Sequence, residues 1–215
     1  CHPIYNAVDP ETHHPVPADP ALRCDLVFVG HRLPDRERRV DDFFLRAAAM
    51  APEFSFVLGG EGWAGKPMPA NVRWIGHVAT GAHNRVNCSA RMVLNINRDS
   101  MAQTGFSPPT RVFEAAGAGA CLVTDAWTGI DTFFAPGSEI LIATSAEEIV
   151  KLLRDTSAEE AAQIGTRMRE RALRDHSYAL RARQVDEILK SADRGKRAMG
   201  EGARPAQSMP SAIPA

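Results

Sequence analysis

Several features are missing from this sequence of 215 residues, and each absence excludes a class of protein. No apolar run approaches the roughly 20 residues that a membrane-spanning helix needs. The net charge is only −1, so no overall basic field draws the chain to nucleic acid or to anionic lipid. The seven histidines and four cysteines show neither metal-ligand spacing nor a C-x-x-C pair. We therefore expect no metal site, no disulfide scaffold, and free thiols in a reducing, cytoplasmic location.

The two ends of the chain differ in composition from its middle, which divides the sequence into three parts. Residues 1–24 carry five prolines and no sustained period, so we expect an extended interdomain linker. The chain begins with Cys1 rather than Met, and its first residues do not form a signal peptide, so we expect a fragment of a longer protein. Residues 194–215 are rich in Gly, Pro, Ala and Ser, which predicts a disordered tail after a domain at 25–193.

Between these ends, strand-like and helix-like segments alternate. Short apolar runs predict strands, and apolar residues at helical spacing predict helices. The expected strands are 25–30, 54–58, 72–76, 91–95, 121–124 and 139–142. The expected helices are 35–51, 83–89, 108–118, 128–134, 146–153, 158–174 and 178–192. This alternation predicts an α/β fold, a Rossmann-like parallel sheet with helices on both faces, whose ligands bind beyond the carboxyl ends of the strands.

One glycine-rich loop imitates two nucleotide-binding motifs and satisfies neither. Residues 60–65 read G-x-G-x-x-G, and with Lys66 they nearly complete a P-loop pattern. Both motifs require a helix directly after the glycines, whereas the alternate prolines that follow forbid a regular helix. Pro67 also replaces the hydroxyl residue that would hold magnesium in a P-loop. We therefore expect a surface turn, with Trp63 covering part of a ligand.

Residues 104–120 are the most informative segment, because they place one carboxylate, Glu114, in an otherwise apolar helical run. Ser107 is suited to cap the start of this helix, and the two prolines that follow it are tolerated in a first turn. The free N–H groups and the positive end of the helix dipole then favour a bound anion such as phosphate. A lone acid beside such a site suits hydrogen bonds to ribose hydroxyls. The alternative is an amphipathic helix with one solvated glutamate.

The order of the segments and the residues around Glu114 resemble the C-terminal domain of a GT-B glycosyltransferase, and more closely the spore-maturation (CgeB-like) branch. The resemblance is most specific over 95–137 and is supported by 29–32, 74–77 and 134–137. It implies a hexosyltransferase-type enzyme, of which this chain is the half that binds a nucleotide-diphosphate sugar. The sugar would pass to an unidentified acceptor on a missing N-terminal domain, so the fragment alone should turn over little. No cofactor is implied, because the nucleotide sugar is the substrate.

The resemblance also implies roles for the residues at the start of the 108–118 helix. Glu114 would accept hydrogen bonds from the donor ribose. Ser107, Thr110 and the first N–H groups of the helix would meet the diphosphate or the sugar. The full set of donor-binding candidates is Gly30, His31, Arg32, Asn97, Ser107, Thr110, Arg111, Glu114, Asp125 and Trp127.

Two loops after predicted strands complete the implied donor site. Gly30 would let the backbone approach the diphosphate closely. Arg32, together with Arg36 or Arg39, would neutralise the charge of the diphosphate, because a guanidinium can grip two phosphate oxygens. Trp127 would either stack on the base or pack in the core.

The chain departs from related enzymes in one respect that leaves its stereochemistry open. Related retaining transferases often carry an E-x7-E pair, and Phe106 occupies the position of the earlier acid. Retention and inversion both stay open, and the catalytic residues are unassigned. No D-x-D triplet occurs, which agrees with a metal-independent mechanism. A non-catalytic nucleotide-sugar-binding module and a GT-B-fold UDP-sugar epimerase remain as alternatives.

Overall fold

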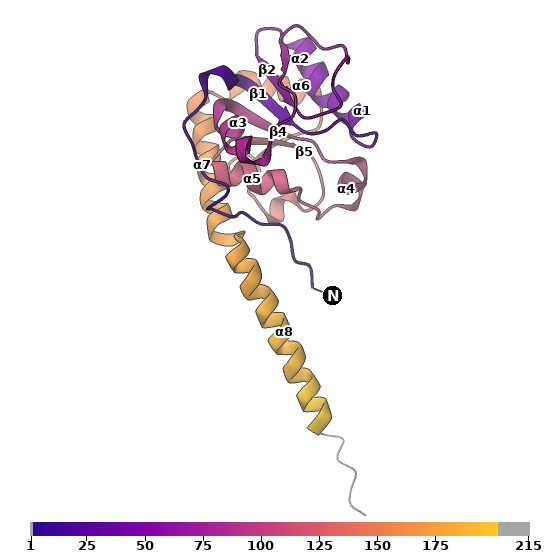
Figure 1. Ribbon diagram of the computed structural model, residues 1–215, viewed down its shortest axis with the longest axis vertical. Helices are drawn as coiled ribbons and strands as arrows, with labels where there is room; N and C mark the ends of the chain where they lie inside the picture. The colour runs from indigo at the N-terminus through magenta and orange to yellow at the C-terminus, as the bar shows by residue number, and fades with distance from the viewer. Residues whose placement is uncertain (1, 202–215) are drawn as a thin grey trace, which may run out of the picture.

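Six parallel strands form one sheet at the centre of the computed structural model, which describes residues 2–201 and the side chains of residues 2–192 (Figure 1). The strands are β1 (Cys24–Val29), β2 (Phe56–Gly59), β3 (Val72–Trp74), β4 (Ala90–Asn95), β5 (Leu122–Asp125) and β6 (Leu141–Ala143). Their order across the sheet is β3-β2-β1-β4-β5-β6, so the direction of winding reverses between β1 and β4. The predicted Rossmann-like α/β fold is confirmed, and ligands in such sheets bind at the carboxyl edge beside the reversal.

Helices cover both faces of the sheet (Figure 1). They are α1 (Glu37–Val40), α2 (Arg46–Met50), α3 (His83–Ser89), α4 (Asp99–Thr104), α5 (Thr110–Ala118), α6 (Ala146–Asp155), α7 (Ala158–Asp175) and α8 (Tyr178–Glu201). A π-helical turn, η2 (Asp41–Leu45), joins α1 to α2, and the short 3-10 turns are η1 (Pro20–Leu22), η3 (Thr80–Ala82) and η4 (Ile130–Thr132). Among the described residues, no helix is long and apolar enough to cross a membrane.

The alternation of side chains along each strand decides which helices a residue contacts. In β1, Leu26 and Phe28 belong to one apolar cluster, together with residues of α2 and α6. Val27 and Val29 belong to the other cluster, together with residues of α3 and α5. Because both faces of β1 are covered, its sequence is a continuous apolar run rather than an alternating one.

Two helical expectations differ from the structure. The predicted helix at 128–134 is reduced to the single 3-10 turn η4, and Gly129, the N-cap residue before it, has a left-handed φ of 94°. Helix α4 was not predicted, because its residues, Asp-Ser-Met-Ala-Gln-Thr, show no apolar period. It lies in the loop between β4 and α5, at the carboxyl edge of the sheet.

The predicted linker packs against the domain instead of standing apart from it. Val8 is fully buried, its N–H donates to the His176 carbonyl oxygen at 2.8 Å, and its own carbonyl oxygen accepts from Tyr178 at 3.1 Å. Gly117 of α5 permits this approach, because a Cβ there would lie 2.5 Å from the Cβ of His13. Part of the segment before β1 therefore belongs to the folded domain.

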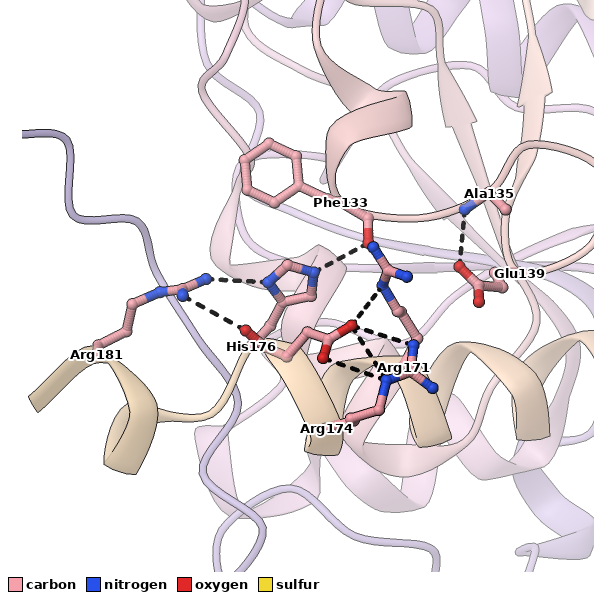
Figure 2. Close-up of polar contacts among 8 residues, drawn as sticks. Phe133, Ala135, Glu139, Arg171, Arg174, His176 and Arg181 are labelled. Carbon is pink, nitrogen blue, oxygen red and sulfur yellow. Dashed lines mark hydrogen bonds and ion pairs between the residues drawn. The ribbon is translucent and has the colours of Figure 1, made fainter. Parts of the chain in front are cut away.

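The buried side chain of His176 stabilises the connection between α7 and α8 (Figure 2). An arginine side chain can only donate hydrogen bonds. Nη2 of Arg181 lies 3.0 Å from Nδ1 of His176, so this ring nitrogen is an acceptor. The ring proton is then on Nε2, which donates to the Phe133 carbonyl oxygen at 3.0 Å. Burial lowers the pKa of His176, which favours this neutral form.

Helix α8 projects away from the rest of the domain (Figure 1). It extends to Glu201, so residues 194–201 continue the helix and do not start the predicted disordered tail. The remainder of that predicted tail, 202–215, lies outside the described residues.

Candidate functional site

A pocket of about 200 Å³ lies at the carboxyl edge of β1 and β2, where this topology places ligands. Three arginines line it from separate parts of the chain. Arg36 precedes α1, Arg98 precedes α4, and Arg111 lies in the first turn of α5. Three guanidinium groups around one cavity repel one another, so this arrangement favours an anionic ligand. We call it the anion pocket, and its other walls include Gly30, His31, Gly60 and His83.

Gly30 and Arg36 lie in such close contact that only glycine fits at position 30 without displacing its neighbours. A Cβ on Gly30 would lie 2.8 Å from Nη1 of Arg36. Burial lowers the pKa of Arg36, and the positive charges of Arg98 and Arg111 lower it further. A bound anion would offset this repulsion among the three arginines.

Glu114 lies next to the anion pocket, and His83 connects it to the cavity. His83 begins α3, lines the pocket, and places its Nδ1 3.3 Å from Oε2 of Glu114. Burial alone would raise the pKa of Glu114, but the His83 contact and the charge of Arg111 outweigh it, so this pKa lies below its usual value. Burial lowers the pKa of Arg111, and the Glu114 charge opposes that effect. Glu114 is therefore an ionised group beside a cluster of cations.

The start of α5 differs from the predicted capping arrangement. The helix begins at Thr110, its N-cap residue is Pro109, and Ser107 does not cap it. Gly105 and Phe106 both have positive φ angles, 67° and 44°, so the chain turns directly before Ser107. Ser107 is half-buried and Thr110 is exposed, and neither is among the residues that line the anion pocket.

Three other predicted donor-binding residues are buried and do not line the pocket. Asp125 and Asn97 are each 1% exposed, and Oδ1 of Asp125 accepts the backbone N–H of Asn97 at 3.1 Å. Trp127 packs in the apolar cluster that contains Phe133, with ring centroids 6.0 Å apart. Of the two roles open to Trp127, the structure supports packing. Trp63, expected to cover part of a ligand, is likewise buried in the core.

Of the two predicted residues after Gly30, only one lines the anion pocket. His31 lines the anion pocket and stacks on His77, with ring centroids 6.2 Å apart. Arg32 instead forms an ion pair with Glu37 at 2.7 Å, outside the pocket wall. Arg98 occupies the pocket in its place, and no local sequence signal singled out Arg98. Among the described residues, no group of three or more His, Cys, Asp or Glu side chains is placed to hold a metal ion.

Comparison with known proteins assigns the chain to a family. A family model described as glycosyl transferase-like matches residues 36–187, and the chain belongs to this family. The matched region contains the three arginines of the anion pocket and Glu114. A comparison with curated proteins finds no match.

Solved structures share the fold at low sequence identity. HepE from Anabaena, solved with UDP-glucose, aligns over 87% of this chain with a TM-score of 0.66 and 14% identity. Sucrose-phosphate synthase from Thermosynechococcus elongatus aligns over 89%, with a TM-score of 0.65 and 16% identity. AviGT4, a glycosyltransferase involved in avilamycin A biosynthesis, aligns over 87%, with a TM-score of 0.59 and 19% identity. The chain covers only 57%, 52% and 57% of these proteins, and its fold is that of a Rossmann-like domain of a GT-B glycosyltransferase.

Proposed function

We propose that this chain is the donor-binding half of a glycosyltransferase, which transfers a sugar from a nucleotide-diphosphate sugar to an unidentified acceptor. The observation that carries the proposal is the pocket in which Arg36, Arg98 and Arg111 converge beside Glu114. A diphosphate would supply the negative charge that this pocket favours. Membership of a glycosyl transferase-like family, and the UDP-glucose bound in the HepE structure, support a nucleotide sugar over an unrelated anion.

The anion pocket would act on the leaving group of the transfer. Negative charge grows on the nucleotide diphosphate as its bond to the sugar breaks, and preplaced guanidinium groups stabilise that charge without reorganising. Each guanidinium can hold two phosphate oxygens at once. Gly30 also lines the pocket, and its missing side chain leaves room for the guanidinium of Arg36, whose Nη1 would lie 2.8 Å from a Cβ at this position. In this proposal arginine charge stabilises the leaving group, so the mechanism is metal-independent.

Glu114 would bind the ribose of the donor. Its lowered pKa keeps it ionised, and an ionised carboxylate only accepts hydrogen bonds, as ribose hydroxyls require. The His83 contact involves Oε2, so we assign Oε1 to the ribose. His83 therefore orients the carboxylate, while Arg111 lies on the same helix and faces the phosphates.

Several finer features belong to the same proposal. The transferred sugar is a hexose, the chain belongs to the CgeB-like branch, and the acceptor binds a second domain outside this sequence. The small share of HepE that the chain covers, 57%, supports a second domain in the complete protein. The chain alone should then bind donor but turn over little, because only one wall of the cleft is present.

Donor binding by the 215-residue chain tests the proposal. Thermal shift and calorimetry with UDP-, GDP-, TDP- and ADP-glucose should reveal at least one sugar nucleotide that raises Tm. The matching nucleoside diphosphate should bind more tightly than the monophosphate, and the nucleoside most weakly, because charge contributes most of the affinity. If none of these sugar nucleotides binds, the proposal is wrong.

Two variants separate the phosphate contacts from the ribose contact. Arg36→Ala should weaken both nucleoside diphosphate and inorganic pyrophosphate about 10-fold or more, because it removes a charged hydrogen-bond donor. Glu114→Gln should weaken the nucleoside diphosphate but not pyrophosphate, because pyrophosphate has no ribose and is only relieved of the repulsion from the Glu114 charge. Arg38→Ala is the matched control, since this side chain is 91% exposed and lies outside the pocket. Equal behaviour of the Arg36 and Arg38 variants would contradict the assignment.

A further inference from the structure

A buried polar network adjoins the anion pocket at the carboxyl ends of β4 and β5. We propose that Asp125 and Arg39 are positioning residues, which hold Arg98 in the anion pocket without touching the ligand. This inference rests on the proposed function, because the placement of Arg98 matters only if the pocket binds an anion. It also gives the buried Asp125, expected from the sequence to bind donor directly, a different role.

Both carboxylate oxygens of Asp125 are occupied within the protein. Oδ1 accepts the N–H of Asn97 at 3.1 Å, and Oδ2 accepts from Nη2 of Arg39 at 2.5 Å. The Asp125 side chain is 0% exposed, so it has no surface left for a ligand. The amide of Asn95 extends the network, because its Nδ2 donates to Oδ1 of Asn97 and to Oγ1 of Thr124, each at 3.0 Å.

The network holds the chain on both sides of Arg98. Before Arg98, the N–H of Asn97 is bound to Asp125. After it, Oδ1 of Asp99 lies 3.5 Å from Nη1 of Arg39. The carbonyl oxygen of Arg98 itself accepts two N–H groups from the first turn of α4, at 3.1 and 3.0 Å. The N–H of Asp99 also donates to the Asp35 carbonyl oxygen at 3.1 Å, so the backbone of residues 97–99 is held where Arg98 enters the pocket.

The ion pair between Asp125 and Arg39 is not explained by stability alone. Burial raises the pKa of Asp125, and the charge of Arg39 is the largest influence that opposes this. Apolar residues can often replace a buried ion pair without loss of stability. An apolar pair, however, could not bind the backbone N–H of Asn97 before Arg98 or the carboxylate of Asp99 after it. The geometry thus matches a role in placing Arg98.

A double-mutant cycle on UDP affinity tests this role, with calorimetry of wild type, Asp125→Asn, Arg98→Ala and the double variant. If Asp125 acts through Arg98, Asp125→Asn should weaken UDP binding about 10-fold in the wild-type background and change little once Arg98 is alanine. The sign is informative, because removing a negative charge near an anion site would by Coulomb interaction alone tighten binding. Asp42→Asn is the matched control, an acid that is 59% exposed and should leave the affinity unchanged.

A second variant keeps the test decisive if Asp125→Asn fails to fold. Asp99→Asn changes a side chain that is 53% exposed, and it weakens the contact with Arg39 on the other side of Arg98. The positioning role is overturned if these variants weaken UDP binding equally with and without Arg98, leave the UDP affinity unchanged, or tighten it. Each of these outcomes would leave the proposed function standing. If wild type binds none of UDP, GDP, TDP and ADP, the proposed function itself fails.

Discussion

Gly165 of α7 is a position where the structure should reverse the usual effect of a substitution. Alanine in place of glycine inside a helix normally stabilises it by about 1 kcal/mol. Gly165 is buried, and a Cβ on it would lie 2.2 Å from the Gly119 carbonyl oxygen and 2.8 Å from the carbonyl carbon of Ala120. Both atoms belong to the backbone that joins α5 to β5, so no side chain can rotate aside. Gly165→Ala should therefore push α7 away from this connection.

The size of the effect follows from two opposing contributions. Forcing an extra methyl group into a packed site costs about 1 to 3 kcal/mol, and the rigid backbone here favours the upper end. Subtracting about 1 kcal/mol for the better helix propensity of alanine leaves a net loss of about 2 kcal/mol. For a chain of 215 residues, this loss corresponds to a fall in Tm of about 4 to 8 °C.

Thermal and urea unfolding, followed by circular dichroism, measure this change. The urea midpoint should fall without a change in the m-value, because the extent of the folded structure is unaltered. Gly81→Ala is the control, since nothing lies within 4 Å of the added Cβ, and it should change the free energy of unfolding by less than about 0.5 kcal/mol. A Gly165→Ala protein at least as stable as wild type would refute the reasoning.

Three further predictions concern protonation and thiol reactivity. Hydrogen bonds from an arginine and a lysine lower the pKa of Glu37 from 4.5 to about 2, so Glu37→Gln should be less stable than wild type at neutral pH. Urea unfolding should show this difference in stability disappearing as the pH falls from 4.5 towards 2. Burial lowers the pKa of His176 below 6.5, so on acidification the unfolded chain binds a proton at this residue before the folded chain does, and wild type should lose stability as the pH falls below 6.5. An equally steep loss of stability in His176→Phe would contradict this prediction. Burial raises the pKa of Cys88 and raises the pKa values of Cys24 and Cys121 to about 12, so few of these thiols are in the reactive thiolate form at about pH 8. Peptide mass spectrometry should therefore find slow labelling by iodoacetamide in the native protein and rapid labelling in urea.

The buried strands were predictable because each contains a short apolar run, such as 26–29 in β1 and 56–58 in β2, and recognising this run needs no information from elsewhere in the chain. The predicted strand 91–95 differs from β4 by one residue, and the predicted helix 83–89 is α3 itself. Helix α4 could not be found in this way, because it has no apolar face and starts where the Arg98 carbonyl oxygen accepts its first N–H groups. The packing of the N-terminal segment was not predicted for a similar reason, since it depends on the space left at Gly117, which has no side chain.

The candidate site was predictable only in part. Gly30, His31 and Arg111 do line the anion pocket, because they follow a strand or begin the helix beyond one. Asp125 ends β5 and Trp127 follows this strand closely, yet both are buried. A position after a strand identifies the edge of the sheet, but it does not say which residues at that edge are covered by others.

The sequence by itself determined the alternation of strands and helices, the edge at which a ligand would bind, and an acid in the helix at that edge. These features depend on periodicity and propensity over short stretches. Only the tertiary structure decided that Arg36, Arg98 and Arg111 share one pocket, because the pairing of β1 with β4 brings the β1–β2 connection, which carries Arg36, beside the β4–β5 connection, which carries Arg98 and Arg111. It also decided that Asp125 is buried rather than free for a ligand, because its partner Arg39 lies 86 residues away along the chain.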